Sequence, residues 1–248
     1  MDKVLLVTGG SRGIGAATCK LAAQHGWAVA VNYSANALAA DEVVRGIRAD
    51  GGRAMSVQAD VADESQVLRM FEHIDAKLGP LSGLVNNAGV VDVSARVQDM
   101  SVQRWRRMFD INVMGSMVCA REAVRRMSPS HGGSGGSIVN VSSAAARLGA
   151  PGQYVDYAAA KGAIDAFTIG LAKEVGPDGI RVNAVRPGLI ETDIHASGGL
   201  PNRVRDLQHQ VPMGRGGTAQ EVAQLIVWLL SDAASYTTMS LIDVSGGR

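Results

Sequence analysis

Short aliphatic runs alternate with longer amphipathic stretches along the whole chain. Strands are expected at residues 4–8, 28–32, 54–58, 81–87, 137–142, 180–185 and 240–244, and helices at 13–25, 37–50, 64–78, 101–127, 157–175 and 218–231. The strand segments are continuously apolar, which is typical of a sheet that helices cover on both faces. Repetition of strand and helix in this order predicts an α/β fold with a doubly wound parallel sheet.

The same rhythm continues from one end of the chain to the other, so we expect a single domain over residues 1–248. The net charge is +1, which gives no reason to expect a nucleic acid or a membrane as a partner. Apolar runs stay well below the roughly 18–20 residues that a membrane helix needs. The first of them ends in a glycine-rich turn, unlike a signal peptide.

The cysteines and histidines indicate neither disulfides nor a metal. Cys19 and Cys119 stand alone inside helical patterns, without a CxxC pair. Isolated thiols of this kind are typical of a reducing compartment, so we expect a cytoplasmic protein. The histidines have no metal-ligand spacing, and no metal site is expected.

The segment VLLVTGGSRGIG leads from the first expected strand directly into a helix. Within it, Gly9, Gly13 and Gly15 form the pattern TGxxxGxG. Glycines let the backbone turn tightly and approach a ligand, and the N–H groups at the start of a helix attract a pyrophosphate. The turn therefore predicts a dinucleotide site.

The end of the second strand indicates which dinucleotide is favoured. Folds that prefer NAD usually carry an acid there, which binds the ribose 2′-hydroxyl. In this chain the position is neutral, at Asn32, Tyr33 and Ser34, and Arg12 in the glycine-rich turn can pair with a 2′-phosphate. These features favour NADP(H), with NAD(H) as the alternative.

The segment QYVDYAAAKG places two tyrosines before one lysine. Lys161 follows Tyr157 by one helical turn on the same face, whereas Tyr154 is two turns, or about 10 Å, away. A nearby ammonium group, together with an oxidised nicotinamide, lowers the pKa of a phenol, so we expect Tyr157 to be the proton donor. Tyr154 is expected to precede the helix and to line the substrate pocket, with Asp156 as the helix N-cap.

Two further polar residues lie where chemistry is expected. Ser143 ends the fifth strand, at the edge where parallel sheets bind ligands, and its hydroxyl can bind a substrate oxygen. Its neighbour Ser142 should point to the other face. Asn112 interrupts an apolar helical stripe, and a buried amide needs partners. It is either a satisfied core residue or an anchor for a water that relays protons to Lys161.

With the glycine-rich turn, NNAG at 86–89, IVNVSS at 138–143 and YAAAK at 157–161, the whole chain resembles the short-chain dehydrogenase/reductase family. The resemblance implies a Rossmann-type sheet of seven strands, hydride transfer between NAD(P) and a carbonyl or alcohol carbon, and a homotetramer. It implies the catalytic set Asn112, Ser143, Tyr157 and Lys161, with Ser143, Tyr154 and Tyr157 at the substrate.

The resemblance also implies a cofactor-binding set. Asp60 would lie by the adenine and Asn86 by its ribose, and Lys161 would bind the nicotinamide ribose. The full set is Gly9, Ser11, Arg12, Gly13, Ile14, Gly15, Asn32, Tyr33, Ser34, Asp60, Val61, Asn86, Ala88, Gly89, Tyr157, Lys161, Pro187, Gly188, Ile190 and Thr192.

The sequence departs from the family pattern at two points. The spacing between Ser143 and Tyr157 is one residue longer than is common, so the substrate-facing loop carries an insertion. Met239 occupies a position where glycine is frequent. The segment 188–217 follows the sixth strand and is expected to fold over the substrate as a lid.

Three functions compete. The first is reduction of a small carbonyl compound or oxidation of the matching secondary alcohol. The second is reduction of 3-oxoacyl groups on an acyl carrier protein, for which Arg121, Arg125 and Arg126 could form a basic docking patch, although Asp178 opposes it. The third is a non-catalytic NADP(H)-sensing module, which would not need the Tyr–Lys pair.

Overall fold

A computed structural model describes residues 3–192 and 198–248, and within them the main sheet has seven parallel strands in the order β3-β2-β1-β4-β5-β6-β9. Its strands are β1 (Val4–Val7), β2 (Ala28–Tyr33), β3 (Ala54–Gln58), β4 (Leu81–Asn86), β5 (Gly136–Val141), β6 (Ile180–Pro187) and β9 (Leu241–Val244). The expected Rossmann-type sheet is confirmed. The strand order reverses at β1, between β2 and β4, and ligands of open parallel sheets bind at such a switch point.

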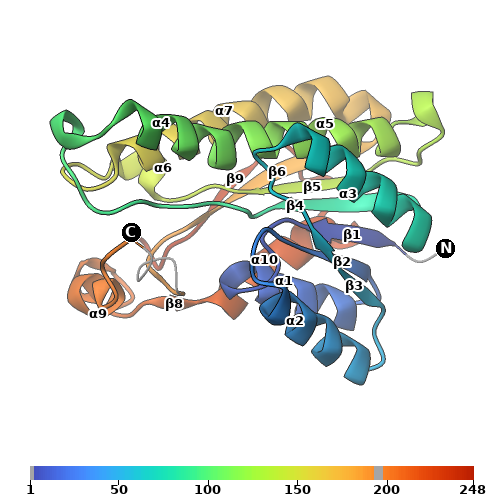
Figure 1. Ribbon diagram of the computed structural model, residues 1–248, viewed down its shortest axis with the longest axis horizontal. Helices are drawn as coiled ribbons and strands as arrows, with labels where there is room; N and C mark the ends of the chain where they lie inside the picture. Colours follow the sequence, from blue (N-terminus) through green and yellow to red (C-terminus); the bar gives the residue numbers. More distant parts are fainter. Residues whose placement is uncertain (1–2, 193–197) are drawn as a thin grey trace.

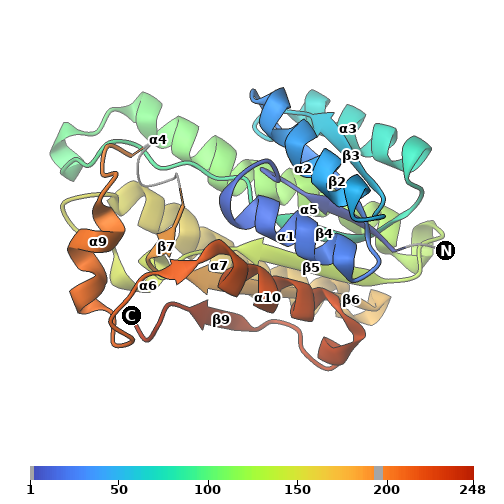
Figure 2. The same cartoon turned by 90° about the horizontal axis from the view of Figure 1, so that it is seen from below.

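Helices cover both faces of this sheet (Figures 1 and 2). One layer holds α1 (Gly13–Gln24), α2 (Ala37–Ala49) and α10 (Ala219–Leu230). The other holds α3 (Glu64–Lys77), α4 (Val102–Phe109), α5 (Gly115–Met127) and α7 (Val155–Val175). Because both faces are covered, the central strands are almost fully buried, which explains why their sequences are apolar without alternation.

Two helix starts show how side chains fix the element boundaries. Thr218 accepts from the main-chain N–H of Glu221, whose carboxylate accepts from the N–H of Thr218, so the capping box expected at α10 is formed. Asp63 caps α3 by accepting from Ser65 and Gln66. The cap expected at Asp156 is wrong, because α7 begins at Val155 and Tyr154 is its N-cap residue.

The helix expected at 101–127 is interrupted. A short π-helical turn, Asp110–Met114, separates α4 from α5 and contains the buried Asn112. Single π turns inside α-helices are rare and occur frequently at functional sites. The extra residue of the π turn shifts the faces of α4 and α5 relative to each other. The sequence periodicity predicted one continuous helix and did not reveal this shift.

A small two-stranded sheet pairs the two ends of the segment 188–217. Strand β7 (Ile190–Glu191) pairs with β8 (Gly217–Thr218), and the short helices α6 (Ala145–Leu148) and α9 (Arg203–Leu207) lie nearby at the same end of the molecule (Figure 2). Part of the expected lid, residues 193–197, lies outside the described residues. In the described part of the chain, none of the helices is both long and apolar enough to cross a membrane.

Candidate active site

The glycine-rich turn after β1 fits a ligand that needs close backbone approach. Gly9 has a φ of +61°, and a side chain on Gly15 would overlap the main-chain oxygen of Gly9. Helix α1 begins directly after the turn, and its N-cap residue Arg12 makes no side-chain capping bond. The first N–H groups of α1 therefore stay available, which suits the pyrophosphate of a dinucleotide.

Asn87, which sequence reasoning passed over, stabilises this turn from β4. Its amide donates to the main-chain oxygens of Thr8 and Gly9 at 2.9 and 3.0 Å. The Thr8 hydroxyl in turn accepts from the N–H groups of Asn87 and Ala88, both at 3.0 Å. The motif NNAG was the signal for this contact, since its second asparagine follows the end of a strand adjacent to the turn.

Asn32 lies at the end of β2 as expected, but its side chain points inward. It is 2% exposed, and its oxygen accepts from Gly9 N at 3.1 Å while its nitrogen donates to Ala59 O at 3.0 Å. The amide thus links the glycine-rich turn to the end of β3. The side chains that face solvent here are those of Ser34 and Arg12, with Tyr33 half-buried.

The other residues expected at the adenosine end differ in exposure. Asp60 is exposed, and its carboxylate accepts from Ala62 N at 3.0 Å, while Val61 is buried. Asn86 is also buried, and its amide donates to Ser116 O and to Asn140 Oδ1. The Asn86 nitrogen therefore binds Ser116 and Asn140, while its buried oxygen has no hydrogen-bond partner among the described residues. Contact of Asn86 with a ribose stays a prediction.

Ser143, Tyr157 and Lys161 lie together beside the carboxyl end of β5. The Ser143 hydroxyl is near enough to the Tyr157 phenol to lower its pKa, and Lys161 Nζ lies 5.6 Å from the centre of the Tyr157 ring. Lys161 Nζ donates to Val141 O at 2.7 Å. Ser142 faces away from this group, as expected, and donates to Lys161 O at 3.2 Å.

Burial dominates the titration of both Tyr157 and Lys161. It raises the pKa of the Tyr157 phenol above its usual value, and the hydrogen bond from Ser143 only partly offsets this. It lowers the pKa of Lys161 to about 8, against the opposing charge of Asp165. In the protein without cofactor, burial therefore sets the direction of the Tyr157 shift. The lower pKa expected from the ammonium together with an oxidised nicotinamide stays a prediction.

Asn112 is a satisfied buried amide next to this group. Its nitrogen donates to Val90 O and Met108 O, both at 3.0 Å, and its oxygen accepts from Val90 N at 3.2 Å. A side chain on Gly89 would come within 2.7 Å of Asn112 Oδ1 and 3.6 Å of Lys161 Nζ. The two N–H groups of the amide are both used, and the oxygen, which accepts one bond here, can accept a second one. The amide holds Val90 by both main-chain groups, and a water anchored at Asn112 stays a prediction.

One cavity of about 550 Å³ connects these groups. Eight residues of the expected cofactor set line it: Ile14, Gly89, Tyr157, Lys161, Pro187, Gly188, Ile190 and Thr192. Ser143 and Tyr154 line it as well, and Thr192 also approaches Gly13 across the turn. The remaining expected residues are outside its lining, toward the adenosine end: Gly9, Ser11, Arg12, Gly13, Gly15, Asn32, Tyr33, Ser34, Asp60, Val61, Asn86 and Ala88.

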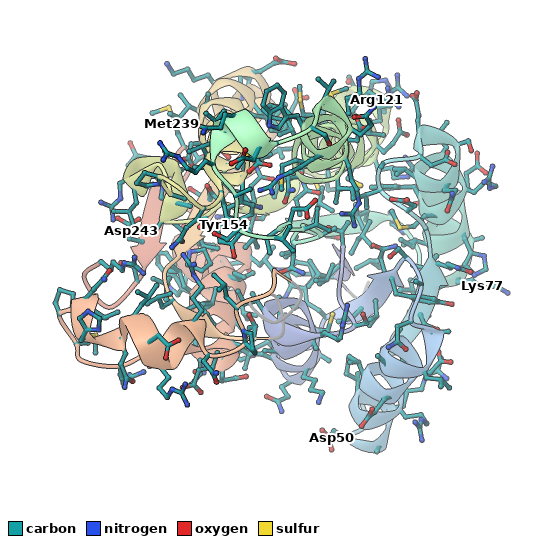
Figure 3. The ribbon with its side chains drawn as sticks, turned by 60° about the vertical axis from the view of Figure 1, so that its left-hand side comes forward. Asp50, Lys77, Arg121, Tyr154, Met239 and Asp243 are labelled. Atoms are coloured by element: carbon teal, nitrogen blue, oxygen red, sulfur yellow. The ribbon has the colours of Figure 1, made fainter. Side chains whose placement is uncertain are left out.

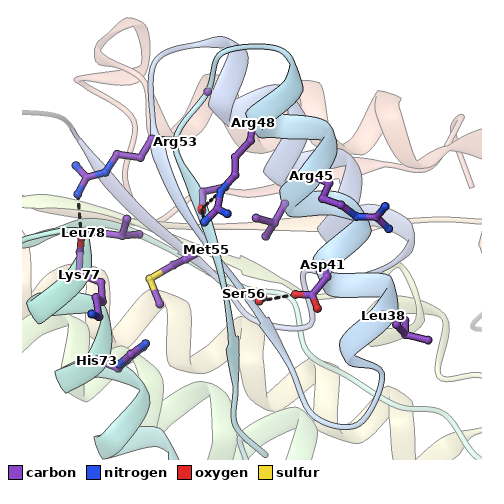
Figure 4. Close-up of a pocket in the computed structure, with 13 residues that line it drawn as sticks. Leu38, Asp41, Arg45, Arg48, Arg53, Met55, Ser56, His73, Lys77 and Leu78 are labelled. Carbon is purple, nitrogen blue, oxygen red and sulfur yellow. Dashed lines mark hydrogen bonds between the residues drawn. The ribbon is translucent and has the colours of Figure 1, made fainter.

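A larger hollow, about 880 Å³, lies at the outer edge of the sheet between α2, β3 and α3 (Figure 4). None of the expected site residues lines it, and Arg48 closes part of the strand edge by donating to Ala54 O. Such covering of an edge strand protects it from pairing with other chains. The smaller cavity is the candidate active site, because the groups able to do chemistry meet there.

Sequence reasoning missed an ion pair and several polar residues on the substrate side of the cavity. Arg104 on α4 binds Asp156 on α7 at 2.6 Å, and both side chains are buried. This pair fixes the start of α7 just before Tyr157. Gln153, Arg203 and Arg248 line the cavity but belong to no local motif, and only the folded chain brings them together. In the described residues no His, Cys, Asp and Glu side chains form a metal-binding group.

The chain was compared with known proteins. Residues 9–248 match the family model described as "Enoyl-(Acyl carrier protein) reductase". An uncharacterized oxidoreductase, YgfF of Escherichia coli, is 57% identical over 99% of both chains. The cis-4-hydroxycyclohexanecarboxylate dehydrogenase of Sinomonas cyclohexanicum is 40% identical over 99% of this chain and 96% of its own.

Further similarity extends to carrier-protein reductases and to solved structures. The 3-oxoacyl-[acyl-carrier-protein] reductase FabG of Staphylococcus aureus is 36% identical over all of this chain and 98% of its own. A variant of a Serratia marcescens short-chain dehydrogenase/reductase has a TM-score of 0.91 at 33% identity, over 99% of this chain and 97% of its own. The chain therefore belongs to the short-chain dehydrogenase/reductase family, whose members are oxidoreductases that act on CH–OH groups.

Proposed function

We propose that this protein reduces a carbonyl group of a small molecule to a secondary alcohol with NADPH, and catalyses the reverse reaction when the alcohol and NADP⁺ are in excess. The observation that carries the proposal is the single cavity that Ser143, Tyr157 and Lys161 line together with Gly89 and Thr192. Bound nicotinamide would supply the hydride.

The residues of the cavity suit the proton half of this reaction. The Ser143 hydroxyl lines the cavity beside the phenol, so it can bind the substrate oxygen and stabilise negative charge that develops on it. Tyr157 donates its proton to that oxygen. A phenol whose pKa is raised by burial stays protonated at neutral pH, which suits a proton donor in the direction of reduction.

Lys161 and Asn112 act around the tyrosine. The ammonium of Lys161 stabilises negative charge left on the phenol, and its remaining N–H groups can bind a ribose hydroxyl. Asn112 is a positioning residue, because its amide holds Val90 by both main-chain groups and thereby keeps Gly89 beside Lys161. Water, anchored at Asn112 in the prediction made from the sequence, would return the proton through Lys161.

Arg12 and Asn32 support the preference for NADPH. Arg12 is exposed beside the glycine-rich turn, and within residues 3–192 and 198–248 it has no ion pair. An arginine there can bind a 2′-phosphate, and the end of β2 carries no acid to repel it. Comparison of kcat/KM for NADPH and NADH tests this preference, and NAD(H) is the alternative.

Reduction of 3-oxoacyl groups on an acyl carrier protein is the second candidate, supported by similarity to carrier-protein reductases. The arginines considered as its docking patch are neutralised by nearby acids. Arg121 binds Glu64 and Glu122, Arg125 binds Glu122, and Arg126 binds Glu122 and Asp75. Paired arginines attract an acidic carrier weakly, so the small-molecule reaction is preferred.

The same assay separates the candidates. Oxidation of NADPH is followed spectroscopically with a panel of ketones, aldehydes and sugars, and with acetoacetyl groups attached to an acyl carrier protein. The proposal expects turnover of a small ketone or aldehyde and none that depends on the carrier. Turnover that needs the carrier would favour the second candidate, and no NADPH oxidation with any compound would favour the non-catalytic sensing module.

We also propose a cytoplasmic homotetramer. Trp105, Phe109 and Met117 leave apolar surface exposed on the α4–α5 side, and Trp228 does so on α10. Two separate apolar faces on one subunit suit the two interfaces of a tetramer with dihedral symmetry. Both cysteines are free and buried, which suits a reducing compartment. Light scattering after size-exclusion chromatography tests the assembly.

A further inference from the structure

The substrate side of the active-site cavity is positively charged. Among the described residues that line it, the charged ones are Lys161, Arg203 and Arg248, and none is Asp or Glu. Lys161 belongs to the proposed catalytic group. The two arginines come from separate parts of the sequence, helix α9 and residue 248, and both line this cavity.

Arg203 is held in place without neutralising its charge. Its guanidinium lies 5.2 Å from the centre of the Tyr154 ring, and its Nη1 donates to Gln153 Oε1 at 2.7 Å. Tyr154 is itself fixed, since its hydroxyl donates to Gly198 O at 3.3 Å. Figure 3 shows Tyr154 between the layer of α4 and α7 and the segment that carries α9. A neutral amide and an aromatic face leave further N–H donors of Arg203 for a ligand.

Arg248 is also held by neutral partners on its side chain. Its Nη2 donates to Gln210 Oε1 at 3.3 Å, and its main-chain oxygen accepts from Arg147 Nη2 at 2.9 Å. Across the described residues, neither Arg248 nor Arg203 forms an ion pair, whereas the neighbouring Arg147 pairs with Asp243 and Arg205 with Asp206. Both side chains line the same cavity. Burial and, to a smaller extent, the positive charge of Arg203 lower the pKa of Arg248.

Two guanidinium groups line one cavity whose described lining has no Asp or Glu side chain, and their partial burial is costly unless a ligand supplies negative charge. Guanidinium groups bind carboxylates through paired N–H donors, so the natural complement is an oxyanion on the substrate. A relative with 40% identity is named as a dehydrogenase of a hydroxycyclohexanecarboxylate, an alcohol that carries a carboxylate.

We propose that Arg203 and Arg248 bind a carboxylate of the substrate, so that this protein acts on oxo acids and hydroxy acids rather than on neutral ketones. This inference rests on the proposed function, from which it takes the reaction, reduction of a ketone with NADPH. The ketone carbon receives hydride from NADPH and the ketone oxygen receives the proton of Tyr157, which gives a hydroxy acid and NADP⁺. The carboxylate takes no part in the chemistry and serves to orient the substrate, with its carbonyl directed toward Ser143 and Tyr157.

Binding of unreactive compounds tests the site without turnover. Isothermal titration calorimetry would compare cyclohexanecarboxylate, cyclohexanecarboxamide and cyclohexyl phosphate, each with the protein alone and with NADP⁺. We expect the carboxylate to bind about 10- to 100-fold more tightly than the carboxamide, since hydrogen bonds to charged groups are the stronger ones. Equal binding of the two, or no binding of either, would overturn the inference. Tight binding of cyclohexyl phosphate alone would overturn the carboxylate inference and indicate that the site binds a phosphate ester.

Variants assign the effect to the two arginines. Arg203→Met keeps an apolar stem against Tyr154, and Arg248→Met removes the second charge; each should abolish most of the preference for the carboxylate. Arg205→Met removes a charge from the same short helix, but Arg205 is exposed and paired with Asp206, so the preference should persist. If Arg205→Met lost the preference for the carboxylate to the same extent, the preference would come from long-range charge. That result would contradict a direct contact of Arg203 and Arg248 with the carboxylate.

Turnover then separates this inference from the proposed function. With NADPH, kcat/KM for 4-oxocyclohexanecarboxylate should exceed that for its methyl ester, and Arg203→Met should lower the ratio of the first value to the second. Reduction of acid and ester at equal rates would overturn the carboxylate site and leave the reductase intact. Tight carboxylate binding in a protein that reduces none of the ketones would support the carboxylate site and overturn the proposed reductase function.

Discussion

The ammonium group of Lys161 donates a hydrogen bond to the main-chain oxygen of Val141 at 2.7 Å, in a position where the side chain is 5% exposed. This burial is why its pKa falls to about 8, despite the attraction of Asp165 one turn further along α7. Because the proposed reaction needs the charged ammonium, kcat/KM for ketone reduction should fall as the pH rises through about 8. The measurement is kcat/KM with NADPH between pH 6 and 10.

The matched control is Lys161→Met, which cannot titrate at this position. Its low residual activity should lack the decline near pH 8 that the unmodified protein shows. The raised pKa of Tyr157 keeps the phenol protonated through the same range, so it does not add a second decline there. A profile for the unmodified protein that stays flat up to pH 10 would contradict the role given to the lysine.

The same shift should appear in the free energy of unfolding. The folded-state pKa of Lys161, about 8, lies below the value of 10.5 for an unperturbed lysine, so between these pH values the unfolded chain binds more protons than the folded one. Stability contributed at this position therefore rises with pH across that interval. The free energy of unfolding is measured by urea titration for the unmodified protein and for Lys161→Met. The difference, unmodified minus variant, should increase from pH 8 to pH 10. A decrease would contradict the assigned direction of the pKa shift.

Tyr157→Phe removes the phenolic proton while keeping the aromatic ring. Turnover should drop to near background, a loss of about 10²- to 10⁴-fold that is typical of removing a general acid. Binding of NADPH, followed by its fluorescence, should be nearly unchanged, because the ring still fills the same space. Tyr236→Phe makes the same chemical change at a fully exposed position and should leave turnover intact. Near-normal activity of Tyr157→Phe would refute the assignment.

The sequence predicted the sheet well, because strand positions follow from local patterns, and the residues predicted for the site include several that line one cavity. Apolar runs located the strands, and motifs at strand ends brought Ser143, Tyr157 and Lys161 to one cavity. The sequence could not predict properties that depend on contacts between residues far apart in the chain. The inward turn of Asn32 depends on Ala59 O, and the pKa of Tyr157 depends on how deeply α7 buries it. The hydrogen bond from Arg203 to Gln153 joins helix α9 to the turn before α7, and these two segments have no common motif.

Asn32→Asp tests the preference for NADPH and follows from the hydrogen bonds of the buried amide. An aspartate can still accept from Gly9 N, but it cannot donate to Ala59 O and would be repelled by that oxygen. The carboxylate should turn toward the cofactor cleft, where it repels a 2′-phosphate and binds a ribose hydroxyl. The ratio of kcat/KM for NADH to that for NADPH should rise at least about tenfold, since nearby charges repel by ~1–4 kcal/mol.

The substitution at Asn32 should also lower the melting temperature, because the lost hydrogen bond leaves a buried carbonyl oxygen without its donor. Asn36→Asp is the matched control: this residue is exposed and caps α2 by accepting from Ala39 N, a role that aspartate fills equally well. Cofactor preference and stability should stay the same in the control. An unchanged cofactor ratio in Asn32→Asp would show that position 32 does not face the ribose in either form.

Met239 adopts a left-handed backbone, with a φ of +63°, at the position where the family resemblance suggested glycine. Its N–H donates to Val182 O at 2.7 Å, which holds the backbone in place beside β6, and its side chain is 42% exposed. A side chain in this conformation costs about 1–2 kcal/mol, and little burial is lost when it is removed. Met239→Gly should therefore raise the free energy of unfolding by about 1 kcal/mol in urea titrations, after the greater flexibility of glycine in the unfolded chain is included. Met239→Ala keeps a Cβ atom in the same backbone conformation and should give no such gain; equal stabilisation by both would locate the effect in the lost thioether rather than in the backbone.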